Sequence, residues 1–61
     1  MAMFEVRLKL RGEVKTYEVE APSVANTGEL KREALKVAEI NGDKEFVNNS
    51  ESVSLTFYKR I

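Results

Sequence analysis

The chain contains no cysteine, no histidine and no tryptophan among its 61 residues. Without cysteine it has neither a disulfide framework nor a reactive thiolate, and without histidine it lacks the commonest metal ligand and general base. It also has no excess charge of either sign, because ten lysine and arginine residues balance ten acidic residues. This balance argues against the broad basic surface of a dedicated nucleic-acid-binding domain.

Long hydrophobic runs are missing too, so we expect no membrane-spanning segment and no membrane partner. The first five residues lack the basic stretch and apolar core of a signal peptide, which makes the cytoplasm the expected compartment. Hydrophobic residues make up 43% of the chain and charged residues 33%, as in a soluble globular protein. The length suits a single small domain over 1–61, with little volume to spare for a deep pocket.

The first third of the chain predicts a β-hairpin. Apolar residues occupy every even position from Phe4 to Leu10 and the odd positions from Tyr17 to Ala21. Gly12 provides the positive φ of a tight turn. A two-residue loop, Arg11-Gly12, puts both apolar sets on one face, and so does a four-residue loop, whereas a three-residue loop does not. Pro22 ends the second strand, because it cannot donate to the ladder.

A helix is expected next. Asn26 or Thr27 can cap its start, with Glu29 as a capping-box partner of Asn26, and Gly42 suits the left-handed position after its end. Leu35 lies at the border of the apolar face. That face is predicted to consist of Leu30, Ala34, Val37, Ala38 and Ile40.

The last third predicts one more strand, in which Val53, Leu55 and Phe57 alternate with polar residues and Tyr58. Two interpretations remain open for 45–47: a short extra strand, or a loop whose Phe46 plugs the end of the core. The predicted core consists of Phe4, Val6, Leu8, Tyr17, Val19, Leu30, Ala34, Val37, Ala38, Val53, Leu55 and Phe57.

These elements predict an α+β fold: a two-layer sandwich with a three-stranded, mainly antiparallel sheet and one helix on one face, in the order β-β-α-β. The first strand is the most apolar, so we expect it in the centre, between the second and the last. The alternative pairs the last strand with the second, in parallel, through a right-handed crossover. So small a core barely offsets the conformational entropy of the chain, which makes a homodimer a reasonable expectation.

Little in the sequence supports catalysis. Ser50 and Ser52 have no histidine to activate them, and the three glycines stand apart, so there is neither a triad nor a phosphate-binding loop. We therefore expect no enzyme, no cofactor, no metal and no small-molecule substrate. A group of carboxylates on the outer sheet face can hold a cation, but its basic neighbours favour a solvated surface. These carboxylates are Glu5, Glu18 and Glu20, and the neighbours are Arg7 and Lys9.

Protein binding fits the expected surfaces best. The sheet would leave its outer face and two edges open, and strand edges can pair with a partner's strand. Met3, Val14 and Tyr58 are expected to be exposed on the outer face, and Leu35 offers a second contact on the helix. The sequence thus predicts a non-enzymatic protein-binding module or a self-associating structural protein. The candidate contact residues are Met3, Arg7, Lys9, Val14, Leu35, Tyr58 and Arg60.

The alternative function is binding of single-stranded nucleic acid. Basic residues around an exposed aromatic side chain on a sheet form a stacking platform, and Arg7, Lys9, Tyr58 and Arg60 would form one here. The glutamates expected on the same face and the zero net charge count against this alternative.

The chain follows a strand–strand–helix–strand pattern. Its strands are at Phe4–Leu8, Lys15–Ala21 and Val53–Thr56, its helical segment is Glu33–Ala38, and it ends in Lys59–Ile61. Over nearly the whole chain this pattern resembles small phage- or prophage-encoded proteins, some of which inhibit a host enzyme by binding to it. The resemblance implies a phage protein that contacts a host or phage protein in the host cytoplasm. It contains no signature residue and assigns no site.

Overall fold

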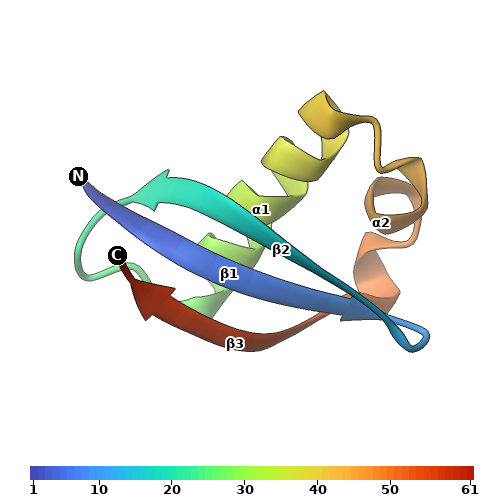
Figure 1. Ribbon diagram of the computed structural model, residues 1–61, viewed down its shortest axis with the longest axis horizontal. Coiled ribbons are helices and arrows are strands. Elements are labelled where there is room, and N and C mark those ends of the chain that lie inside the picture. The colour runs from blue at the N-terminus through green and yellow to red at the C-terminus, as the bar shows by residue number, and fades with distance from the viewer.

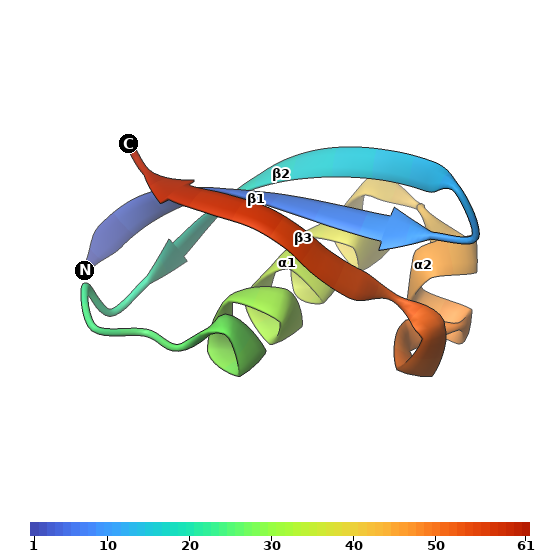
Figure 2. The ribbon, with the colours of Figure 1, turned by 90° about the horizontal axis from the view of Figure 1, so that it is seen from below.

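The computed structural model describes residues 1–61, and Figure 1 shows its sheet face-on, with the first strand between the other two. Figure 2 shows both helices on one side of the sheet, so the opposite side, here called the outer face, is uncovered. The elements are β1 (Ala2–Leu10), β2 (Glu13–Ala21), α1 (Thr27–Asn41), α2 (Lys44–Asn48), the 3₁₀ turn η1 (Ser50–Ser52) and β3 (Ser54–Arg60). The strands form an antiparallel sheet in the order β2-β1-β3, which confirms the predicted α+β sandwich with the first strand in the centre.

The hairpin has the shorter of the two predicted loops. Leu10 pairs with Glu13, so only Arg11 and Gly12 connect the strands, with φ values of +50° and +91°. Positive φ at both central residues is the type I′ geometry, whose twist matches that of the flanking strands. The even positions of β1 and the odd positions of β2 therefore share the face that the helices cover.

The ends of α1 lie at predicted residues, with Asn26 rather than Thr27 as the cap. The Asn26 side chain accepts a hydrogen bond of 2.9 Å from the Glu29 backbone N–H, which satisfies one of the free donors at the start of the helix. Gly42 has φ +82°, and its backbone N–H returns to carbonyls of the last turn. Local chemistry therefore defines both ends.

The buried side of α1 is narrower than predicted. Leu30, Ala34 and Ala38 are fully buried and Val37 is partly buried, but Ile40 is 83% exposed. Because an α-helix turns by about 100° per residue, Ile40 lies about 200° beyond Ala38, on the solvent side. The prediction for Ile40 was wrong.

Segment 44–48 is the short helix α2, so the alternative of an extra strand at 45–47 was wrong. The backbone N–H groups of Phe46 and Val47 both donate to the Asp43 carbonyl and close a helical turn. These two N–H groups are therefore not used for hydrogen bonds to a neighbouring strand. The Phe46 side chain is only 1% exposed and closes the end of the core, as the other alternative predicted, although from a helix rather than a loop.

The core extends along the helix side of β1 and over the part of β2 from Tyr17 to Ala21. It contains nine of the predicted residues, and Val37 and Leu55 pack against it partly buried. Ala2, Leu10 and Ala21 are also buried, although the sequence did not predict them as core residues. They lie at the ends of β1 and β2, where the regular alternation continues.

A β-bulge interrupts the pairing of β3 with β1. Leu8 pairs with Leu55, but Arg7 pairs with Phe57, so Thr56 is an extra residue without a partner. The Thr56 hydroxyl donates a hydrogen bond of 3.3 Å to the Arg7 carbonyl. One extra residue reverses the alternation of every residue that follows it.

Three predictions fail because of this bulge. Phe57 was expected in the core, but it lies on the outer face beside Arg7 and is 40% exposed. Tyr58 and Arg60 were expected on the outer face, but they pair with Val6 and Phe4 and therefore project to the helix side of the sheet. The periodicity of this segment is regular in the sequence, and the bulge shifts it by one residue in the sheet.

Candidate functional site: the outer face of the sheet

The outer face displays twelve residues in four rows that cross the sheet. The strand pairing determines which residues share a row. The Ile61 N–H donates to the Met3 carbonyl at 2.9 Å and so extends the pairing of β1 with β3 by one row. From β2 through β1 to β3, the rows are Glu20, Met3 and Ile61; Glu18, Glu5 and Lys59; Thr16, Arg7 and Phe57; and Val14, Lys9 and Ser54.

Four apolar side chains stand on this face: Met3, Val14, Phe57 and Ile61, each between 40% and 54% exposed. Two of them, Met3 and Ile61, are neighbours at one end, and Phe57 occupies β3 between the ends. The Arg7 guanidinium carbon lies 5.0 Å from the centre of the Phe57 ring, a cation–π contact between β1 and β3.

Charge is unevenly distributed along the strands. The two rows near the chain termini carry three carboxylates, Glu5, Glu18 and Glu20, and only one ammonium group, that of Lys59. The two rows near the hairpin turn carry Arg7 and Lys9 but no carboxylate. The outer face as a whole is neutral, with an acidic half and a basic half.

The structure unites four of the seven predicted contact residues. Met3, Arg7, Lys9 and Val14 lie on the outer face, whereas Leu35 is partly buried on α1. Tyr58 and Arg60 are on the helix side, as the bulge requires. In their place the face gains Phe57, Lys59 and Ile61, for which the alternation in the sequence gave the wrong side or no signal.

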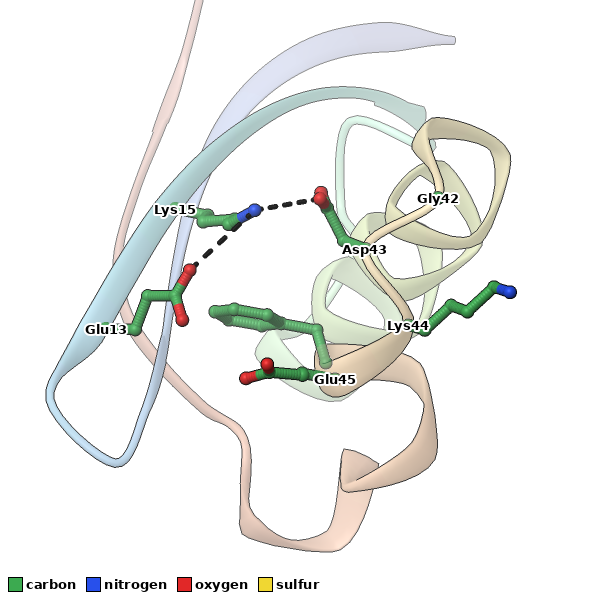
Figure 3. A pocket seen from close by; sticks show the side chains of 7 residues that line it. Glu13, Lys15, Gly42, Asp43, Lys44 and Glu45 are labelled. Carbon is green, nitrogen blue, oxygen red and sulfur yellow. Dashed lines mark hydrogen bonds and ion pairs between the residues drawn. The ribbon is translucent and has the colours of Figure 1, made fainter.

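A second feature is a shallow pocket of about 290 Å³ near the hairpin turn (Figure 3). Lys15 and Asp43 point toward each other there and form an ion pair of 2.8 Å between Nζ and Oδ1, and Lys44 points away from them. The Tyr17 hydroxyl donates to the other Asp43 oxygen at 2.7 Å. The lining residues are Glu13, Lys15, Gly42, Asp43, Lys44, Glu45 and Phe46.

These contacts hold the three groups in their ordinary protonation states. The hydrogen bond from Lys15, and then the one from Tyr17, lowers the pKa of the Asp43 carboxyl, and the bond to Asp43 raises the pKa of Lys15. Burial, together with Asp43, raises the pKa of the Tyr17 hydroxyl. Every shift is away from neutrality, the reverse of what a general acid or base needs. The cluster therefore ties β2 to the α1–α2 junction.

No three carboxylates, those of Glu5, Glu18 and Glu20 included, lie close enough together to hold a metal ion. Neither helix has the length and apolar character needed to cross a bilayer. Comparison with known proteins gives no further guidance, because no family model, no curated protein and no solved structure matches the chain.

Proposed function

We propose that the protein is a non-enzymatic binding module that contacts a protein surface through the outer face of its sheet. The observation that carries this proposal is the uncovered face itself, with four partly exposed apolar side chains among balanced charges. An uncovered face that displays apolar groups among charged residues can bind the surface of another protein. The resemblance to small phage proteins extends the proposal to action in a host cytoplasm.

The alternative of single-stranded nucleic-acid binding has less support. Its four predicted residues are divided between two sides of the sheet, since Tyr58 and Arg60 project away from Arg7 and Lys9. The outer face carries one aromatic ring, that of Phe57, and its three cations are balanced by three carboxylates. A surface that binds the phosphate backbone of a nucleic acid needs a net positive charge, which this face does not have.

The test is affinity capture from host lysate with the tagged protein, with and without nuclease, eluted at two salt concentrations. Phe57→Ala and Arg7→Glu alter the outer face. Val24→Ala and Ile40→Ala are matched controls, because both remove a highly exposed apolar side chain elsewhere. We expect one stoichiometric protein to be captured by the wild type and both controls, and to be lost with the two outer-face variants.

Equal capture by all five proteins would show that the outer face is not the contact surface. Recovery of nucleic acid alone, released by moderate salt, would favour the alternative instead, because phosphate contacts weaken steeply with ionic strength. The circular dichroism spectrum of each variant confirms that it is folded.

A further inference from the structure

The acidic and basic halves of the outer face make it complementary to itself. We propose that this face binds a second copy of the chain, with the two sheets stacked face to face and their β1 strands antiparallel. This inference rests on the proposed function and adds a second copy of the chain as a partner that occupies the same surface. A symmetric dimer uses one patch twice, so the patch must be complementary to its own image.

The arrangement follows from the order of the rows. A twofold axis between the sheets and perpendicular to the strands exchanges the acidic half of one copy with the basic half of the other. Glu5 then lies over Arg7 of the second copy, and its own Arg7 lies under the second Glu5. Both central contacts join opposite charges at the middle of the interface, where such pairs fix the register.

The other twofold axis in the interface plane runs along the strands. The charges on β1 oppose it, although this axis also places Glu18 over Lys59 of the second copy. That axis places Glu5 over Glu5 and Arg7 over Arg7 of the second copy. Like charges brought together across an interface repel each other and weaken association. The charge order along β1 therefore selects one relative orientation of the two copies.

The apolar side chains fit the same orientation. Phe57 meets Lys59 of the second copy, and Met3 meets the second Lys9, whose aliphatic stem can cover it. Stacked sheets lie about 10 Å apart with strands inclined by about 30°, so the pairs nearest the axis keep their registration best. Glu5 and Arg7 are these pairs, which makes them the residues to change.

The experiment is sedimentation equilibrium of purified full-length protein at low salt, from micromolar concentrations to about 1 mM, the weak end of specific association. We expect a monomer–dimer equilibrium for the wild type. In a dimer of Glu5→Arg, both central contacts join two cations. In a dimer of Arg7→Glu, both central contacts join two carboxylates. Each variant alone is expected to dimerise on the order of 100-fold more weakly than the wild type.

The decisive sample is an equal mixture of these two variants. Every central contact then again joins opposite charges, so dimerisation returns to nearly the wild-type affinity as a heterodimer. Glu39→Arg and Arg32→Glu are the matched controls, because they reverse the same charges on the exposed side of α1 and leave the dimer unchanged. Circular dichroism confirms that each variant remains folded.

A wild type that stays monomeric up to the highest concentration overturns the inference. So does a dimer that both variants leave intact, and so do variants that weaken it without rescue in the mixture. If the wild type is monomeric while Phe57→Ala still abolishes capture of another protein, the proposed function stands and only the second copy is rejected.

Discussion

The register of β3 decides which residues the outer face displays, and two changes test it. Because of the bulge, the Phe57 ring is 40% exposed rather than buried. Its remaining burial contributes about three fifths of the ~1.5–3 kcal/mol of a fully buried side chain, and the Arg7 contact adds about 0.5–1 kcal/mol. Phe57→Ala should therefore lower the free energy of unfolding by about 1.5–3 kcal/mol.

Phe46→Ala is the matched control, because it removes the same ring from a fully buried position. Its expected cost is about 3–5 kcal/mol, which is most of the stability of a domain of this size. Urea denaturation followed by far-ultraviolet circular dichroism gives both values. Measurements at two protein concentrations separate the folding of one chain from association.

Deletion of Thr56 gives the sharper result. If Thr56 is the bulge residue, its deletion leaves Leu55 and Phe57 paired with the same residues of β1. The protein then loses only the hydrogen bond of the Thr56 hydroxyl, worth about 0.5–1.5 kcal/mol of unfolding free energy. In a regular strand with Phe57 in the core, the same deletion would expel the ring and cost about 3–5 kcal/mol. A deletion cost in that higher range, with Phe57→Ala as costly as Phe46→Ala, would refute the bulge.

Three further predictions concern the rest of the fold. The pKa of Asp43 is lower in the folded state than its ordinary 3.8, so its contacts stabilise the fold above that pH and this contribution is lost as the pH falls through the folded-state pKa. The difference in melting temperature between wild type and Asp43→Ala should therefore shrink in acid, whereas a constant difference would exclude the ion pair as its cause. The raised pKa of Tyr17 predicts a loss of stability in alkali. The protonated hydroxyl stabilises the fold below pH 10, and this contribution is lost as the pH rises above that value. The melting temperature of Tyr17→Phe should therefore be less sensitive to alkali than that of the wild type. Arg11→Asn should raise the melting temperature by about 2–8 °C, because asparagine accepts the positive φ of the turn more readily; no change would mean that the turn carries no strain.

The parts of the fold that depend on neighbouring residues could be predicted. The hairpin turn, the helix cap and the end of α1 at Gly42 depend on a few adjacent side chains. The sequence limited the turn to a loop of two or four residues and the cap to Asn26 or Thr27, and the structure has the shorter loop and Asn26. The strand order followed from the apolar first strand. The outer-face positions of Met3, Arg7, Lys9 and Val14 follow from the alternation of the hairpin, which is regular.

The remainder depends on contacts between distant parts of the chain. Val53, Leu55 and Phe57 alternate as in a regular strand, so nothing in that segment marks the bulge. It depends on the partner strand, where the Arg7 guanidinium covers the Phe57 ring and the Arg7 carbonyl binds Thr56. Two of the seven candidate contact residues, Tyr58 and Arg60, were therefore assigned to the wrong side of the sheet. The helix at Phe46 was also missed, because five residues are too few to show a period.

The central position of β1 also determines when the fold can be completed. Strand β2, one neighbour of β1, follows it after two residues. The other neighbour is β3, where Ser54 pairs with Lys9 across about 45 residues of chain. During synthesis the hairpin and α1 can form within microseconds from local contacts, whereas the second edge of β1 has no partner until β3 leaves the ribosome. Until then the nascent chain exposes an apolar strand edge, a site of aggregation that only the last strand covers.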